Sequence, residues 1–576
     1  DALTTGDENI AIGHNALGSE DTGNKSIAIG RKALFSQNYD GDTHNIAIGI
    51  EAGENVTTGI KNTLLGGLAG DALTTGEQNI AIGYQALSSE TGADQNVAIG
   101  NNALAVQNAG SGNTYNTAVG DSSGASVTSG VQNTLIGGLA GDALTTGGSN
   151  VVLGYQALTT EQAGGRNVAI GTFALQDLNT DSNAYNVAVG HSAGAQMTTG
   201  LQNTIIGGLA GDALTTGGQN VAVGYEALSS EDAGYFNTAV GFRALKIQDA
   251  GNAYNTAVGY HAGLQVSTGV GNSIVGSGNT AVGRSTMRLH TSGSNCTAIG
   301  AFALGAEDTG SRSIAIGYAA LENQNNDSDN YNVAVGHNAG KMVSTGVNNT
   351  IVGGLAGDAL TTGSENLAIG YQALSSANST ESRNVAVGPY ALQQLDNAST
   401  TNTYNTAVGY AAGLLMTTGT KNTIIGGGAG DAITTANANI AIGYNALSSE
   451  TQGQRNVAIG NSALESQNNT SSTESYNIAI GYHAGNDITT GKENVLIGGL
   501  AGDALTTGQR NTAIGHRALS SETGADQITA IGHDALKSYN KGSGDGNTVA
   551  IGYHAAQAMT TGNGTIIGAL AGNALT

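Results

Sequence analysis

Short apolar phrases of one type recur along the whole chain. The first four are Asn9–Gly13, Ser26–Gly30, Asn45–Gly49 and Asn62–Gly66, which follow one another at a nearly constant spacing. Most contain an Asn, an apolar residue or Thr, an Ala, a second apolar residue and a Gly. Such short runs bounded by Asn and Gly are too short for helices and are typical of strands. The pattern therefore predicts an all-β chain.

Glycines divide each repeat into two sides. The Gly that ends each phrase supplies positive φ at a corner, and a second Gly, as in Thr22-Gly23, marks the return corner. Each coil is roughly 17–19 residues long, with two short strands and two turns. This predicts a parallel β-solenoid, in which neighbouring coils lie about 4.8 Å apart. The Asn that opens most strands is expected to form a column of stacked amides.

A longer repeat of about 72 residues groups these coils in fours. Its marker, Ala-Gly-Asp-Ala-Leu-Thr-Thr-Gly, is clearest around Asp71 and has diverged near residue 285, where Gly283–Gly293 stands in its place. We expect one continuous solenoid domain over residues 1–576, and a segment of a longer chain with its anchor and tip elsewhere. The eight periods start near residues 1, 71, 142, 212, 285, 358, 431 and 503.

Alternation within each strand separates its large residues from its alanine. In Asn9–Gly13, Ile10 and Ile12 point to one face and Ala11 to the other. If the Ile pair fills the coil, a column of alanines lies outside, flat enough to press against another chain. The opposite orientation leaves Ile outside and demands burial even more strongly. Both arrangements predict an oligomer, and three-fold symmetry is the simplest closed form for a fibre. The alanine column includes Ala47, Ala81, Ala98, Ala118, Ala188 and Ala222.

Composition narrows the class of protein. The net charge of −24 argues against nucleic acid and anionic membranes as partners. The single cysteine, Cys296, excludes an intrachain disulfide framework, and no stretch has the length of a transmembrane helix. These features are compatible with an extracellular fibre.

The phrase Asn-[Ile/Thr/Val]-Ala-[Ile/Val]-Gly-x-x-Ala, from Asn9 to Ile551, resembles the head repeats of trimeric autotransporter adhesins and the collar and shaft repeats of bacteriophage tail fibres. The resemblance implies a left-handed parallel β-roll, a homotrimer and attachment at a cell or virion surface. The coils here are longer than those of the adhesin heads, because of inserts such as Phe35–His44 and Gln393–Tyr404. The sequence contains no neck, coiled-coil stalk or membrane anchor.

The resemblance makes the expected function structural. We expect an extracellular fibre or adhesin shaft, in a phage or virus tail fibre or a cell-surface appendage, that presents loops or a tip to a host receptor or glycan. The alternative is a free-standing glycan-binding or ice-binding solenoid. Ice binding needs a Thr array in register, whereas Thr pairs such as Thr74-Thr75 occur once per period.

Two motifs suggest metals but have simpler interpretations. Gly66–Leu73 is similar to a calcium-binding nonapeptide, yet Ala69 replaces one of its glycines and it recurs only once in each long period. Asp71 is therefore interpreted as a turn former. Once-per-period histidines stand about 19 Å apart, too far for one chain to chelate a metal ion with them. They are His191, His261, His337, His483 and His554, and they predict a surface column with no metal site.

Tyrosines and variable inserts are the candidates for recognition. One Tyr column directly precedes the Asn that opens the third strand of a period, except that His44 and Gly546 stand there in the first and last periods. Its rings either stack on a sugar or cover the base of an insert. Its members, the possible receptor or glycan contacts, are Tyr115, Tyr185, Tyr254, Tyr331, Tyr404 and Tyr476. A second column, following the first strand's Gly, is Tyr84, Tyr155, Tyr225, Tyr371 and Tyr444. The inserts are either binding loops or drifting surface loops: Gln107–Asn113, Gln176–Asn183, Asn323–Asn330, Gln393–Thr403, Glu465–Ser475 and Lys537–Asp545.

No enzyme is predicted. The repeats contain no carboxylate pair suited to a cleft, no cysteine nucleophile and no Ser-His-Asp pattern. Glu-Asp pairs at the turns, namely Glu20-Asp21, Glu231-Asp232 and Glu307-Asp308, are expected to be solvated on the surface. Catalytic residues and cofactors are therefore not expected.

Overall fold

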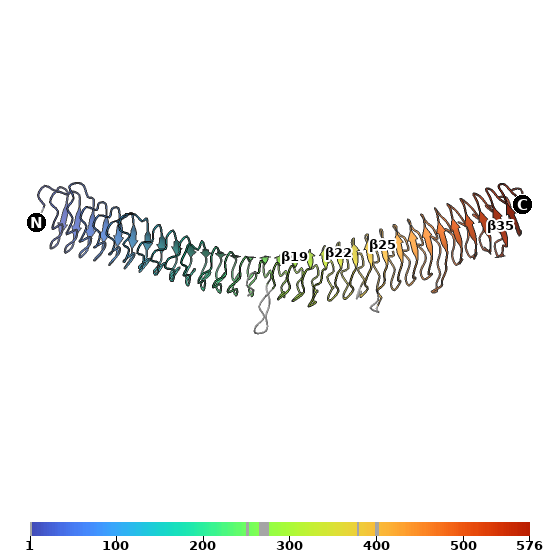
Figure 1. The fold of residues 1–576 in the computed structure, drawn as a ribbon, viewed down its shortest axis with the longest axis horizontal. Coiled ribbons are helices and arrows are strands. Elements are labelled where there is room, and N and C mark those ends of the chain that lie inside the picture. The colour runs from blue at the N-terminus through green and yellow to red at the C-terminus, as the bar shows by residue number, and fades with distance from the viewer. Residues whose placement is uncertain (1–2, 249–252, 264–275, 377–379, 398–401, 576) are drawn as a thin grey trace. The chain divides into compact units, whose positions relative to one another are not determined.

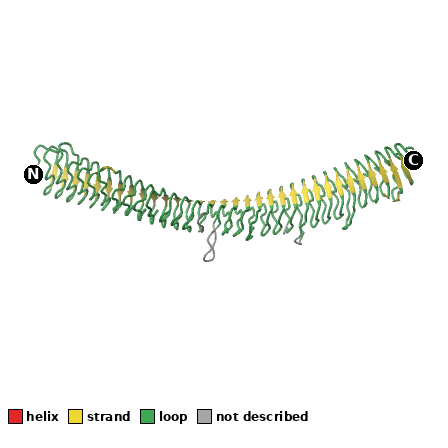
Figure 2. Ribbon diagram, viewed as in Figure 1, coloured by secondary structure: helices red, strands yellow, loops and turns green. Residues whose placement is uncertain are grey.

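The computed structural model describes residues 3–248, 253–263, 276–376, 380–397 and 402–575. The chain divides into two compact units, Asp1–Ser292 and Gly293–Thr576. Strands and turns make up all the described secondary structure, and no helix occurs among these residues (Figure 2). The predicted insert Gln393–Thr403 falls partly outside the described residues.

Nearly every strand is three residues long. In the first unit the strands are β1 (Ile10–Ile12), β2 (Ile27–Ile29), β3 (Ile46–Ile48), β4 (Thr63–Leu65), β5 (Ile80–Ile82), β6 (Ala93–Asp94), β7 (Val97–Ile99), β8 (Gly112–Asn113), β9 (Thr117–Val119), β10 (Thr134–Ile136), β11 (Val151–Leu153), β12 (Val168–Ile170), β13 (Val187–Val189), β14 (Thr204–Ile206), β15 (Val221–Val223), β16 (Thr238–Val240), β17 (Thr256–Val258) and β18 (Thr280–Val282).

In the second unit the strands are β19 (Thr297–Ile299), β20 (Ile314–Ile316), β21 (Val333–Val335), β22 (Thr350–Val352), β23 (Leu367–Ile369), β24 (Val385–Val387), β25 (Thr406–Val408), β26 (Thr423–Ile425), β27 (Ile440–Ile442), β28 (Val457–Ile459), β29 (Ile478–Ile480), β30 (Val495–Ile497), β31 (Thr512–Ile514), β32 (Ala525–Asp526), β33 (Thr529–Ile531), β34 (Gly544–Asp545), β35 (Thr548–Ile551) and β36 (Gly564–Ile567).

Successive coils pair in parallel, with equivalent residues side by side. Ala28 of β2 aligns with Ala47 of β3, and this register repeats along each unit (Figure 1). The predicted parallel β-solenoid is therefore confirmed, with about 31 turns in the two units together.

The prediction of two strands per coil is wrong for most coils. The described residues contain only the short ladders β6–β8 and β32–β34 and a few isolated bridges on the second side. Elsewhere that side is a chain of turns, in which Thr57 N and Thr74 N donate to carbonyls of the next coil. These bonds connect the coils without requiring extended backbone.

The strand glycines allow the coils to approach closely at the corner. Gly30 has a φ of 139°, and a Cβ on it would collide with the carbonyl oxygen of Gly49 in the next coil. A side chain there would both strain the backbone and separate the two coils. The phrase Asn-x-Ala-x-Gly thus ends in Gly for two independent reasons.

The strands have their alanine inside and their large residues outside. Ala28, Ala47 and Ala81 are fully buried, whereas Ile46 and Ile80 on the other face are each 36% exposed. Of the two orientations that the alternation left open, the structure therefore has the one with alanine inside and the large residues outside. In many coils the reason is the turn that follows the strand, where a buried leucine such as Leu34 points into the coil and leaves room for only a methyl group from the strand.

Core volume is shared between neighbouring coils. Leu34 occupies its turn with a φ of 48°, and Gly53 and Gly70 occupy the equivalent turns of the next two coils with φ of 57° and 56°. A Cβ on Gly53 would lie 2.5 Å from a methyl group of Leu64, a large inward residue of the next strand. The alternation of Ala-Leu and Ala-Gly in the sequence is therefore a packing rule: a large inward residue requires glycine opposite.

The predicted asparagine column is buried and hydrogen-bonded. Asn62 donates from Nδ2 to the carbonyl of Gly76 across its own coil (2.9 Å), and its Oδ1 accepts the backbone N–H of Asn79 in the next coil (2.9 Å). Each amide therefore closes one coil and binds it to the next. The partners are mainly backbone groups, with some bonds between the amides themselves, such as Asn96 to Asn79.

The glutamates of the Glu-Asp pairs are not solvated, contrary to expectation. Glu20 is fully buried and accepts the N–H of Gly23 (2.7 Å) and the side-chain amide of Gln37 (2.8 Å). Gln37 in turn accepts from Asn45 (2.9 Å), so one network links three coils. Equally buried are Glu90, Glu161, Glu231, Glu307, Glu381, Glu450 and Glu522. The error arose because adjacent residues at a corner point in opposite directions, Glu inward and Asp outward.

Candidate functional site

The outward residues of the strands form the most extended candidate site. We call the first and third residues of each three-residue strand the outer strand face; in β3 they are Ile46 and Ile48. Because the strands pair in register, these residues form two continuous columns along each unit. In every described three-residue strand the first residue is Ile, Val, Leu or Thr, and the third is Ile, Val or Leu.

This face is apolar and partly exposed over its length. Ile136 is 36% exposed, Val151 41% and Leu153 44%, and most of the remaining members are half-buried by their neighbours. Soluble monomers seldom expose continuous apolar patches larger than a few hundred Å². An apolar face repeated on every coil is therefore typical of a surface that a partner covers.

The first Tyr column lies beside the inserts and is half-exposed. Four of its rings pair with an Arg from the preceding coil: the guanidinium carbon of Arg383 is 5.6 Å from the ring centre of Tyr404, and Nη1 donates to the hydroxyl (2.7 Å). The other three pairs are Arg166–Tyr185, Arg312–Tyr331 and Arg455–Tyr476. In each pair the guanidinium of the preceding coil lies over the Tyr ring.

The remaining two members have different partners. The hydroxyl of Tyr115 accepts from Asn113 (2.7 Å), and Tyr254 stacks on Phe236 with ring centres 4.8 Å apart. All six rings are between 44% and 57% exposed. The structure thus places the predicted Tyr residues at a common position, about four coils apart, without bringing them together. Their assignment to a receptor or glycan stays a prediction.

A second aromatic row follows the strand glycines and is denser than the sequence analysis indicated. Tyr155, Phe173 and His191 lie on three successive coils, with ring centres 6.0 and 5.9 Å apart. Similar rows are Tyr225–Phe242–Tyr260 and Tyr371–Tyr390–Tyr410. Of these rings, the sequence pattern predicted only the first Tyr of each row and His191. The available signal for the others is that the next two coils carry rings one or two residues after their own strand Gly.

The inserts are anchored at their base by the buried glutamates. Glu450 accepts the N–H (3.1 Å) and side-chain amide (3.0 Å) of Asn469, which lies in the insert Glu465–Ser475. Glu161 binds Thr180 of another insert in the same way, through both backbone and hydroxyl groups. The outer parts of the inserts are exposed, as in Ser111–Asn113. A rigid base below an exposed loop is the arrangement expected of a recognition loop.

The recurrent Asp of the period marker lies half-buried at its turn. Desolvation raises the pKa of Asp71 to about 6, with Glu54 and Glu51 adding repulsion. Burial also raises the pKa of its equivalents Asp142, Asp212, Asp358, Asp431 and Asp503. One carboxylate oxygen of each has no hydrogen-bond partner among the described residues. These are energetically costly turn residues, and among the described residues none of them belongs to a group of three or more His, Cys, Asp or Glu side chains close enough to share one ion.

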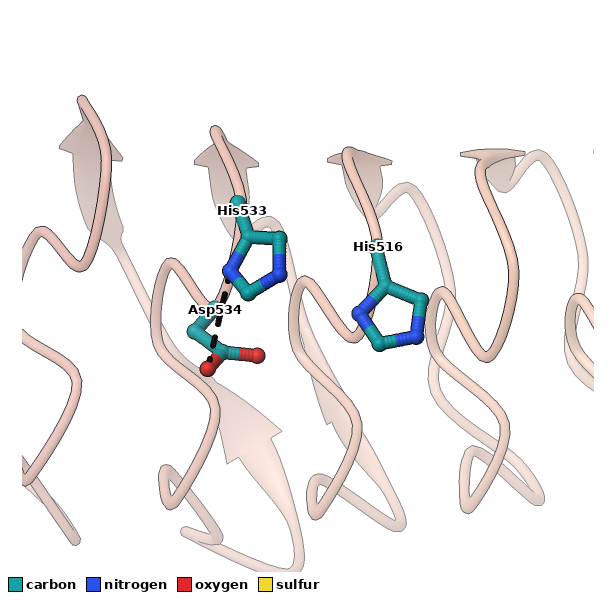
Figure 3. Close-up of side chains that lie close together, drawn as sticks. All are labelled: His516, His533 and Asp534. Carbon is teal, nitrogen blue, oxygen red and sulfur yellow. Dashed lines mark ion pairs between the residues drawn. The ribbon is translucent and has the colours of Figure 1, made fainter.

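Two histidines of neighbouring coils lie close together, which the spacing of the predicted histidines did not indicate. The five predicted histidines, His554 among them, are spaced by a whole period or more. His516 and His533, however, follow the strand glycines of consecutive coils, and their ring centres lie 5.1 Å apart next to Asp534 (Figure 3). The Gly-His pair repeated in consecutive coils was the available signal.

No protein-family model and no curated protein sequence matches the chain. Nor do the described residues include a helix with the length and apolar character needed to cross a bilayer.

Proposed function

We propose that this chain is a structural extracellular fibre or adhesin shaft, from a phage or virus tail fibre or a cell-surface appendage, which presents recognition loops or a tip for attachment to a host or surface. In this proposal the solenoid is a left-handed β-roll with four coils in each long period, and three identical chains assemble side by side. The observation that carries the proposal is the outer strand face, whose third position is Ile, Val or Leu in every described three-residue strand and which is partly exposed in a single chain.

Further copies of the same chain suit this face best. It is continuous and uniform, so a partner must be equally long and regular, which an identical solenoid is. Three such faces also close around one axis, so that each chain buries its face without leaving an open edge. The polar turns, the inserts and the charge of −24 then remain on the outside.

The test is the native mass of the purified chain. Analytical ultracentrifugation or native mass spectrometry is expected to give three times the chain mass of 57.1 kDa, stable to dilution. A stable monomer that remains folded would contradict the proposal.

A free-standing binding solenoid is the second candidate. The observation that favours it is the Thr content of the outer strand face, as at Thr117 and Thr134 of adjacent coils, which gives a β-branched array in register. The Thr pairs at the turns do not contribute, because the hydroxyls of Thr74 and Thr145 donate to carbonyls of the next coil. A folded monomer with thermal hysteresis, or with glycan binding that depends on the outer strand face, would favour this candidate.

A further inference from the structure

The pair His516 and His533 lies on adjacent, register-paired coils. Each residue directly follows the Gly that ends its strand, β31 or β33, and these strands pair in parallel. Both imidazoles are exposed, with an angle of 31° between the rings. In each ring one nitrogen lies on the side of the Asp534 side chain and the other points away from it (Figure 3).

Asp534 is the fixed member of this group. It is only 1% exposed, and Arg517 of the preceding coil donates to both of its oxygens, from Nε (2.8 Å) and Nη2 (2.9 Å). Its Oδ2 is 3.6 Å from Nδ1 of His533. One ligand atom from each of His516, His533 and Asp534 lies within 4.8 Å of the other two.

We propose that His516, His533 and Asp534 bind a divalent transition-metal ion, with Zn²⁺ the best match. Two imidazoles and one carboxylate are ligands that zinc accepts, and three protein ligands leave one position open for water. Bonds of about 2.0–2.2 Å require ligand atoms roughly 3.4 Å apart. The ring nitrogens of the exposed imidazoles need to move inward by only about an ångström to reach that spacing, while their coils keep the usual strand separation of about 4.8 Å.

The surroundings orient the ligands. Arg517 holds the carboxylate in place, and the amide Nε2 of Gln557 donates to Oδ2 at 3.4 Å, so a metal ion bound at Oδ2 would replace this longer hydrogen bond. His554, from the next coil, has Nε2 3.8 Å from the same oxygen, and its Nδ1 lies 2.6 Å from Oε1 of Gln557. When Nδ1–H donates to Gln557, Nε2 is left with its lone pair free. His554 is not one of the three residues whose ligand atoms lie within 4.8 Å of one another, so the fourth position is left to water.

Zinc binding to the full-length chain is the test, measured by isothermal titration calorimetry with zinc chloride at about pH 7.5. We expect one saturable site per chain, and at least about a tenfold loss of affinity in His516→Ala and in His533→Ala. Both residues are exposed, so neither variant is expected to unfold. The matched control is His191→Ala, an exposed His that follows a strand Gly but contacts Phe173 instead of a second His. Its binding should equal that of the wild type.

Two further readouts separate a built site from adventitious binding. Zinc should raise the thermal midpoint of the wild type but not that of the His516→Ala/His533→Ala double variant. Binding should also weaken strongly between about pH 7.5 and 5.5, because the imidazoles must be neutral to coordinate. The proposal is overturned if no saturable binding occurs, or if the double variant binds zinc as the wild type does.

Discussion

The two faces of a single strand carry apolar residues of different size. In β20, Ala315 faces the interior and is fully buried, whereas Ile314 faces outward and is 38% exposed. In most proteins the larger apolar residue would be inside. Here the interior is already filled by the leucines of the turns, so the coil admits only a methyl group from most strands. The comparison shows that the inner face is limited by volume, whereas the outer face carries the larger residues and leaves them partly exposed.

The difference also has an energetic consequence. Burying one Val, Leu or Ile side chain contributes about 1.5–3 kcal/mol, and Ala contributes much less. A single chain therefore leaves its larger apolar groups partly in water. Covering the outer strand face in an assembly would recover this free energy on every coil.

The largest effect is expected from a charge on the inner face. Ala334 is fully buried in β21, and the carboxylate of Ala334→Asp would have no water and no partner there. We expect a loss of about 4 kcal/mol or more, or local unfolding of the second unit. Circular dichroism and limited proteolysis would measure it. A variant as stable as the wild type would mean that the inner face is hydrated.

Charges introduced on the outer strand face should weaken the assembly of chains and leave the folding of each chain intact. Ile316, Val335 and Val352 are aligned on three successive coils, and their replacement by Lys should leave the β signal intact but weaken trimer formation by at least about tenfold. Sedimentation at several concentrations would measure this. The control is three Lys at the exposed insert positions Asn108, Ser111 and Asn113. Equal effects in the two triple variants would contradict assembly through the strand face.

Filling a cavity inside the solenoid should show whether the volume of the coil limits the size of the inward residues. In β18, Ala281 stands where Leu64 stands in β4, and a cavity lined by Leu245, Gly263 and Met287 remains beside it. Ala281→Leu should fill this space and raise the free energy of unfolding by about 1 kcal/mol. In the control, Ala188→Leu, the inward position is fully buried, and overpacking should cost about 1–3 kcal/mol. Denaturant titration distinguishes the two, and destabilisation by both would refute the packing rule.

The smallest expected effect is the change in stability with pH that comes from the half-buried Asp of the turns. These residues are neither as buried as the inner strand face nor as exposed as the surface. Because the pKa of Asp71 is raised from an unfolded value near 3.8 to about 6, the folded chain binds more protons between these values. The contribution of Asp71 to stability should therefore fall as pH rises from about 4 to 6 and then level off. Asp71→Asn should raise the thermal midpoint at about pH 7 but not at about pH 4.

Each such carboxylate is partly solvated, so its contribution should be below about 1 kcal/mol. The matched control is Asp181→Asn, at an exposed insert position, which should leave the pH profile unchanged. A stability that rises between about pH 4 and 6 in the wild type and not in Asp71→Asn would reverse the inferred sign.

Sequence alone determined the repeating unit of this protein. The Asn-x-Ala-x-Gly phrase predicted short strands, and its nearly constant spacing predicted a parallel solenoid with equivalent residues in columns. It could do so because both properties are local: the length of an apolar run limits the strand, and a nearly constant coil length places each phrase over the last.

Only the tertiary structure decided which face of each strand points into the coil. Alternation distinguishes Ile314 from Ala315 but does not orient them, because the room inside a coil depends on side chains contributed by the turn across it. For the same reason the burial of Glu20 could not be predicted, because its hydrogen-bond network runs through Gln37 and Asn45 of later coils. Nor could the meeting of His516 and His533, which depends on the register between coils. Contacts made across coils are set by the stack as a whole, and no single repeat contains them.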